Sequence, residues 1–403
     1  MSETSLEQIL SGKVLRLESS PTFAIDSKAN ELDIELKKQG DYIVRFGIGQ
    51  PDFNTPENIK EAGKKAIDDD RSKYTPASGI NELKAAIVNK FKRDNGLEYE
   101  PANILAGIGA KQVLDTIMRA FINPGDGVLV PKPYWVSYTQ QVLLSGGIPM
   151  EVDFKDDLKI DVDHLKSLIA DFKNPVKLII LNSPNNPTGA VYLREELEEI
   201  GNICLENGIY IISDEVYEKF IYGGIVHHSI AGFSRELKDL TITVNAVSKT
   251  YAMTGWRIGY CAADKAIIKQ MSKIQEQSPS NPCTIAQWAA IEAMEGDQSS
   301  VGLMRDEYEK RRNYVYERLK ATYGIECGLP EGAFYAFPKV SNLYNSRIKS
   351  SDDFSGRLLE EAKVAVVPGS AFGDDRYVRI SYAASMPKII EGMDRIEKFC
   401  KSL

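Results

Sequence analysis

The sequence predicts an α/β protein: a large domain with a mainly parallel sheet flanked by helices, next to a smaller α+β domain. Three observations carry this prediction. Short apolar, β-branched runs alternate with segments of helical spacing between residues 104 and 247. Polar residues follow several of these runs directly, as expected at the strand ends of a parallel sheet. The C-terminal part of the chain mixes helices with short strands.

The composition is that of an ordinary globular protein. Of the 403 residues, 43% are hydrophobic and 26% are charged, and the net charge of −8 argues against a nucleic-acid-binding surface. Five scattered cysteines and only three histidines make a metal site unexpected and favour reduced thiols. The N-terminus lacks the pattern of a secretory signal, and no apolar run has the length of a membrane span. We therefore expect a cytoplasmic protein that binds neither nucleic acid nor membrane.

The N-terminal part begins with residues 1–20, which are mixed in character and are expected to form a loose arm. Helical spacing over residues 24–40 stops at Gly40, and a short strand is predicted over 42–46. Two glycines and a proline follow in residues 47–51 and mark a backbone path on which main chain can approach a ligand. Helices are predicted over residues 55–69 and 80–94. We place an arm and part of the small domain at 1–47, the large domain at 48–290 and the small C-terminal domain at 291–403.

The apolar run 104–108 leads into a helix start that contains Gly107, Gly109, Ala110 and Lys111. A strand, two glycines and a helix N-terminus place backbone N–H groups around a phosphate. Gln112 stands where a dinucleotide-binding fingerprint has its third glycine, so the motif gives little support to that kind of fold. The next strand, 128–130, precedes an aromatic run at 133–138, which suits a packed core or a platform for a flat ring.

Three further buried strands are predicted over residues 177–181, 209–213 and 240–247, with a helix over 193–204 between the first two. Asn186, Asp214 and Lys249 fall at or just beyond their carboxyl ends, where open α/β sheets bind ligands. A lysine at such a position can be an ordinary solvent-exposed side chain, or its amine can attack a carbonyl compound. If that compound is an aldehyde cofactor with a pyridine ring and a phosphate, a carboxylate on the neighbouring strand can keep the ring nitrogen protonated. Tyr217 and Asn186 can bind a hydroxyl on the same ring.

The remaining polar residues supply the other parts of such a site. Ser248, Arg257 and the helix start at Gly109 offer hydroxyl, guanidinium and N–H donors for a phosphate. Arg379, in the apolar strand predicted over 377–382, suits the carboxylate of an amino acid. Taken singly, Asp214 could cap a helix, Arg257 could form an ion pair and Arg379 could be a surface charge. Together they provide every part of one cofactor site.

The last part of the chain is predicted to hold helices over residues 264–277, 284–294, 301–323 and 387–401, and strands over 332–340 and 364–368. From about Pro21 onward the chain resembles the pyridoxal-phosphate-dependent aminotransferases of the aspartate aminotransferase family (class I, fold type I). The segments that carry the resemblance are Asn182 to Gly189, Ser213 to Tyr217, Ser248-Lys249-Thr250, Met253 to Gly259, Val366 to Gly369 and Val378 to Tyr382.

The resemblance implies pyridoxal 5′-phosphate as cofactor, a ping-pong reaction between an L-amino acid and a 2-oxo acid, and a homodimer with shared active sites. Around the cofactor ring, the resemblance implies Lys249 as Schiff-base lysine and general base, Asp214 at the ring nitrogen, Tyr217 and Asn186 at the ring oxygen, and Trp135 on the ring face. At the phosphate it implies Ser248, Arg257 and the helix start formed by Gly109, Ala110 and Lys111. Tyr74 would reach the phosphate of the neighbouring subunit. The implied substrate residues are Gly49, Trp135, Asn186, Arg379 and Lys111.

The amino donor is less constrained than the reaction. In the bacterial relatives that the chain resembles, a lysine at the position of Lys111 helps bind the second carboxylate of aspartate or glutamate. Some relatives carry a further basic residue near the N-terminus, where this chain has Glu18. Aspartate is the expected donor, and aromatic or prephenate substrates remain open. A carbon–sulfur lyase or a cyclopropane-forming synthase on the same scaffold, and a ligand-sensing module without activity, are further alternatives.

Overall fold

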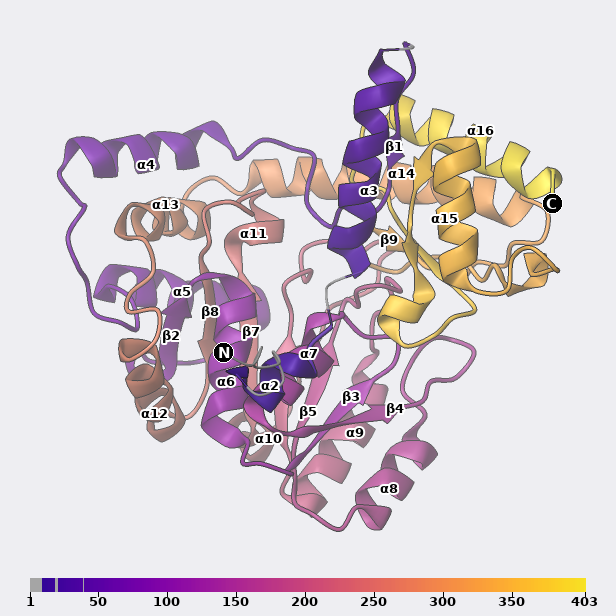
Figure 1. Cartoon of the computed structure of the whole chain (residues 1–403). Coiled ribbons are helices and arrows are strands. Elements are labelled where there is room, and N and C mark those ends of the chain that lie inside the picture. Colours follow the sequence, from indigo (N-terminus) through magenta and orange to yellow (C-terminus); the bar gives the residue numbers. More distant parts are fainter. Residues whose placement is uncertain (1–8, 19–20, 39) are drawn as a thin grey trace, which may run out of the picture.

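A seven-stranded sheet forms the centre of the computed structural model, which describes residues 9–18, 21–38 and 40–403 (Figure 1). The strands β4, β3, β5, β6 and β7 lie side by side in this order, and each is parallel to its neighbours. By contrast, β8 runs antiparallel to both of its neighbours, β7 and β2. The predicted mainly parallel sheet is therefore confirmed. In spatial order the strands are β2 (Ile104–Gly107), β8 (Gly259–Ala262), β7 (Thr241–Ala246), β6 (Tyr210–Asp214), β5 (Val176–Asn182), β3 (Gly127–Pro131) and β4 (Ile148–Val152).

Helices cover both faces of this sheet, because successive strand residues point to opposite sides and both sides are apolar. One face packs against α6, α7 and α12, and the other against α8, α9 and α10, with α5 and α13 beside β2. The helices of this layer are α4 (Glu57–Asp68), α5 (Asn81–Asn95), α6 (Gly109–Phe121), α7 (Ser137–Ser145), α8 (Val162–Asp171), α9 (Arg194–Asn207), α10 (Arg235–Leu240), α11 (Val247–Thr250), α12 (Lys265–Glu276) and α13 (Thr284–Glu295).

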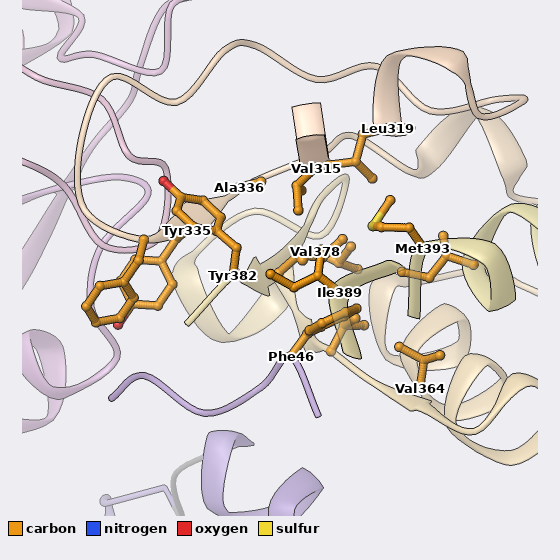
Figure 2. Packing of buried hydrophobic residues seen from close by; sticks show 14 of the residues in the cluster. Phe46, Val315, Leu319, Tyr335, Ala336, Val364, Val378, Tyr382, Ile389 and Met393 are labelled. Carbon is orange, nitrogen blue, oxygen red and sulfur yellow. The ribbon is translucent and has the colours of Figure 1, made fainter. Parts of the chain in front are cut away.

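Beside the central sheet and its helices lies a second layer, in which the N-terminal part of the chain packs with its C-terminal part. β1 (Val44–Arg45) pairs in parallel with β10 (Val364–Ala365), and β12 (Val378–Ser381) lies between β11 (Val367–Pro368) and β9 (Tyr335–Ala336). Figure 2 shows Phe46 packed with Val378 and Ile389 in the core of this layer. Its helices are α3 (Pro21–Lys37), α14 (Ser299–Ala321), α15 (Ser351–Ala362) and α16 (Met386–Lys401).

Several predicted elements differ from the observed ones. The strand expected over residues 332–340 shrinks to β9, since Pro338 cannot donate to a sheet ladder. Residues 12–15 of the expected loose arm form a helical turn, α2 (Gly12–Leu15), while residues 1–8 and 19–20 of that arm lie outside the described part of the chain. α7, α8, α10, α11, α15 and β4 were not predicted from the sequence. Short 3₁₀ turns complete the inventory at η1 (Pro101–Asn103), η2 (Ile230–Gly232), η3 (Ser341–Leu343) and η4 (Gly369–Phe372).

No helix among the described residues combines the length and the apolar character needed to cross a membrane. The domain limits at residues 48 and 290 stay a prediction. The predicted limit at 290 falls inside α13, which packs on α4 and α5.

Candidate active site

The polar residues predicted at strand ends meet at one edge of the central sheet. β5, β6 and β7 are parallel, so the segments that follow them emerge on the same side. β8 runs the other way, which brings the residues before Gly259 to this edge as well. The edge opens into a cavity of about 590 Å³. Of the predicted site residues, the cavity is lined by Gly49, Ala110, Lys111, Trp135, Asn186, Asp214, Tyr217, Ser248, Lys249, Arg257 and Arg379.

Lys249 follows β7 in the single turn of α11, and its side chain reaches across the cavity. Its Nζ donates a hydrogen bond of 2.5 Å to the carbonyl oxygen of Gly49. Burial, followed by the nearby cations Arg379 and Arg257, lowers the pKa of this amine to about 8 against the opposing effect of Asp214. Far more of this amine is therefore neutral near neutral pH than of an ordinary lysine, as a nucleophile or general base requires.

Asp214 ends β6 and is almost fully buried. Its Oδ2 accepts a hydrogen bond of 2.7 Å from the hydroxyl of Tyr138, and its Oδ1 accepts one of 3.4 Å from the Val216 N–H. Burial raises the pKa of Asp214 to about 6, while these hydrogen bonds hold it down. Tyr138 was missed from the sequence, although it lies in the aromatic run one helical turn beyond Trp135.

Tyr217 lies beside the cavity with its hydroxyl 2.9 Å from the hydroxyl of Tyr335. The two rings meet edge to face with centroids 5.7 Å apart. Burial raises the pKa of Tyr217 well above its usual value, so the group stays a phenol and can donate a hydrogen bond. Tyr335 comes from β9, and no local pattern in the sequence marks it as a site residue.

Arg379, on β12, lines the cavity from outside the central sheet. Its Nη1 donates to Oδ1 of Asn186 at 2.9 Å and its Nη2 to the carbonyl oxygen of Gly47 at 2.7 Å. The guanidinium lies over the ring of Tyr335, 4.6 Å from its centroid. Its Nε is buried and has no hydrogen-bond partner among the described residues. A buried N–H without a partner is suited to an anionic ligand, such as a carboxylate.

A possible anion cradle lies where α6 begins. Arg257 has a left-handed backbone with φ of 60°, and its Nη1 donates to the carbonyl oxygen of Thr254 at 2.9 Å. Gly109, at the first turn of α6, does not line the cavity itself, but a Cβ there would lie 2.4 Å from Nη2 of Arg257. Ser248 is buried at the cavity wall. Glycine, guanidinium, hydroxyl and helix N-terminus together suit a phosphate.

Two predicted residues lie at the outer parts of the site. Nζ of Lys111 is 4.9 Å from the centroid of the Trp135 ring, and burial together with the charge of Arg257 lowers the pKa of this lysine. Tyr74 is 92% exposed and does not line the cavity. Its predicted role at a second subunit therefore remains a prediction.

Behind Asp214, a buried polar cluster packs against the turn that follows β6. Ligand atoms of Glu215, Glu218 and His227 lie within 4.8 Å of one another, as in some metal sites. Lys90 pairs with Glu218, and the Asn95 amide donates to both glutamates, at 3.3 and 2.7 Å. These protein donors already occupy the carboxylates, so the cluster is an internal network that holds the turn in place.

Comparison with known proteins identifies the family. The sequence model described as aminotransferase class I and II matches residues 41–396. The chain belongs to this aminotransferase family. The enzyme is 47% identical over 399 residues to an aspartate aminotransferase of Bacillus sp. strain YM-2, covering 98% of this chain and all of the relative. It is 45% identical to a probable aspartate/prephenate aminotransferase of Aquifex aeolicus, covering 96% of this chain and 98% of the relative.

The fold of the aminotransferase agrees with these sequence matches. The crystal structure of the aspartate aminotransferase from Rhizobium meliloti superposes with a TM-score of 0.92 at 37% identity, covering 97% of this chain and 98% of that one. The predicted fold type I architecture is thereby confirmed. The family uses pyridoxal phosphate. The residues present fit that group, because an amine, a buried carboxylate and an anion cradle line one cavity and Arg379 Nε is left free among the described residues.

Proposed function

We propose that this aminotransferase moves the amino group of L-aspartate to 2-oxoglutarate in a ping-pong reaction with pyridoxal 5′-phosphate. One observation carries the proposal. The cavity at the sheet edge brings together the Lys249 amine with its lowered pKa, the buried Asp214 carboxylate and the Arg379 guanidinium with an unpaired N–H among the described residues. Each of these groups serves a different part of the reaction.

The cofactor would be held by the following residues: Lys249 at the aldehyde carbon, Asp214 at the ring nitrogen, Tyr217 and Asn186 at the ring oxygen, Trp135 on one ring face, and Ser248, Arg257 and the Gly109, Ala110 and Lys111 turn at the phosphate. When bound, pyridoxal phosphate supplies an aldehyde and a pyridine ring that accepts electrons. Tyr138 supports Asp214 in its ionised form through its hydrogen bond.

The protein binds the substrate through its α-carboxylate and then moves a proton. Arg379 would hold that carboxylate, together with Asn186 and the backbone at Gly49, and so orient the Cα–H bond towards Lys249. The neutral amine of Lys249 takes the proton from Cα as a general base and returns a proton as a general acid. Because the pKa of this amine is about 8, its neutral and protonated forms are both populated at a pH slightly above neutral.

The proposal of aspartate as donor is supported by Lys111, whose ammonium lies over Trp135 at the cavity wall, where it is suited to a second carboxylate. The Bacillus and Rhizobium relatives are named aspartate aminotransferases, and the Aquifex relative is named for aspartate and prephenate. A lyase or a sensing module is not favoured by these comparisons.

A panel of amino donors with 2-oxoglutarate, followed at the absorption band of the cofactor, tests the proposal. Aspartate is expected to convert the bound cofactor fastest, and Lys249→Ala is expected to show no turnover. Release of pyruvate and ammonia from cystathionine without any 2-oxo acid would instead identify a lyase. A faster reaction with phenylalanine or prephenate would reassign the donor.

We also propose a homodimer located in the cytoplasm. A hollow of about 560 Å³ lies beside Arg257 and is lined by Trp256, Cys283 and Ile285, which gives room for a residue such as Tyr74 of a second subunit. All five cysteines lie in the described part of the chain and are unpaired, as expected for a reducing compartment. Sedimentation analysis of the purified enzyme, with a monomer as the contrary result, tests the first part.

A further inference from the structure

The segment 47–53 crosses the active site as irregular chain, yet two of its carbonyl oxygens bind cations of the site. Gly47 accepts the hydrogen bond from Arg379 Nη2 at 2.7 Å, and Gly49 accepts the one from Lys249 Nζ at 2.5 Å. Regular secondary structure does not hold these carbonyl groups in place. Their positions depend on how the two ends of the segment are anchored.

The first end is anchored in the small-domain core. The N–H of Phe46 donates to the carbonyl oxygen of Ala365 at 2.8 Å, and its own carbonyl oxygen accepts from the N–H of Ser381 at 2.8 Å. The ring of Phe46 is fully buried among Val378 and Ile389 (Figure 2). Packing and two backbone hydrogen bonds therefore fix the chain up to Gly47.

The other end is anchored by a buried arginine from α14. Nη1 of Arg311 donates to Oδ1 of Asp52 at 2.7 Å, and its Nε donates to Oε1 of Glu307 at 3.0 Å. The guanidinium carbon lies 5.1 Å from the ring centroid of Phe53 and 5.5 Å from that of Tyr308. Arg311 is only 5% exposed.

This arrangement differs from an ordinary surface ion pair. A planar guanidinium that is bound by two carboxylates and lies close to two aromatic rings has a defined orientation, and Arg311 itself is buried although Asp52 is partly open to solvent. Removing it would leave Asp52 without its partner, and the segment from Gly49 to Asp52 would lose its second anchor.

We propose that Arg311 is a positioning residue for the substrate-carboxylate subsite, because its bond to Asp52 anchors the far end of the segment that carries the carbonyl groups of Gly47 and Gly49. Arg311 itself does not line the cavity. The inference rests on the proposed function, since it assumes that Arg379 and this backbone bind the substrate carboxylate.

Arg311→Met tests the inference, and the chain offers a matched control in Arg312→Met. Arg312 is the next residue of α14 and is equally buried, at 5% exposure. Its guanidinium binds the carbonyl oxygen of Pro330 and Glu309 instead of the active-site segment. Both variants remove a buried guanidinium from one helix, so a general loss of stability affects both.

Arg311→Met is expected to raise the KM for aspartate, and the dissociation constant of the unreactive dicarboxylate maleate, about tenfold, with kcat changed less than about threefold. In the cofactor-free protein, hydrogen exchange of peptides from residues 46–53 should accelerate. Arg312→Met should show neither change. Equal effects of the two variants on KM and on exchange would overturn the inference.

Asp52→Asn and the double variant complete the test. If the two side chains act as one anchor, the double variant should have about the same KM as Arg311→Met alone, and additive effects would contradict this. Failure of the proposed function is distinguishable, because the wild-type enzyme would then not convert aspartate, although the hydrogen-exchange comparison would still report on the anchor.

Discussion

The hydroxyl of Tyr138 lies 2.7 Å from Oδ2 of Asp214, and both side chains are buried. The contact joins the first turn of α7 to the end of β6. Burial raises the pKa of Asp214 to about 6, and the rise would be larger without the hydrogen bond from Tyr138, which favours the ionised carboxylate. Asp214 is therefore mostly ionised at neutral pH, as its proposed pairing with a cationic ring nitrogen requires.

Replacing Tyr138 by Phe should therefore weaken cofactor binding. Loss of a hydrogen bond to a charged group costs about 1.5–3 kcal/mol, which corresponds to about tenfold to a hundredfold in the dissociation constant of pyridoxal phosphate. Spectral titration of the cofactor-free enzyme measures this constant. Tyr134→Phe is the control, because that hydroxyl binds Glu151 outside the cavity. An unchanged constant in Tyr138→Phe would contradict the assigned support.

The reactivity of Lys249 should follow its lowered pKa. Only the neutral amine attacks an aldehyde, so borohydride-trapped labelling of the cofactor-free protein by pyridoxal phosphate should rise with pH through about 8. Arg379 is one of the cations that disfavour the ammonium form, and Arg379→Met should move the midpoint to higher pH. Mass spectrometry of the labelled peptide measures both. A midpoint near 10.5, the ordinary value for lysine, would refute the burial argument.

Lys111 should matter for dicarboxylates alone. Lys111→Ala is expected to lower kcat/KM for aspartate about tenfold to a hundredfold and for phenylalanine less than about threefold, because only the first substrate has a second carboxylate. Steady-state assays with both donors measure the ratio. Arg119→Ala removes a cation from the same helix that pairs with Asp115 away from the cavity, and it should leave the ratio unchanged. Equal losses for both donors in Lys111→Ala would point to a role in the cofactor site instead.

Gly109 should be required for the phosphate cradle. In Gly109→Ala the new Cβ would displace Arg257, in addition to the strain of a φ of +74°. Gly208→Ala is the matched control, because its φ is +65° but open space surrounds it. Both variants should lose about 1 kcal/mol of stability, and only Gly109→Ala should bind pyridoxal phosphate more weakly. Thermal unfolding and spectral titration separate the two effects, and equal cofactor affinity would show that the cradle tolerates the methyl group.

The central sheet was predictable because its strands are buried on both sides and appear as continuous apolar runs, such as Leu178 to Leu181. The edge strand β4 was not, since it alternates in exposure and holds Pro149 beside two glycines. α7 escaped prediction because its aromatic start looks like a strand end. The short strands of the small domain have only two to four residues each, so turns and packing determine them more than periodicity does.

Within the site, residues at strand ends could be predicted from their shared position, as with Asp214 and Lys249. Tyr335 could not, because it meets Tyr217 across 118 positions of sequence and no local pattern records that contact. The same holds for the carbonyl group of Gly47, which is a main-chain acceptor that any residue could supply. Their roles follow only from the folded chain.

The bond between Arg379 and the carbonyl oxygen of Gly47 links positions 332 residues apart. A nascent polypeptide that still lacks β12 therefore has no Arg379 to fill the proposed role at the substrate α-carboxylate, however well its central sheet has formed. On this proposal the subsite for the amino-acid carboxylate is completed only when β12 has been synthesised, and a chain that ends in α15 would lack it.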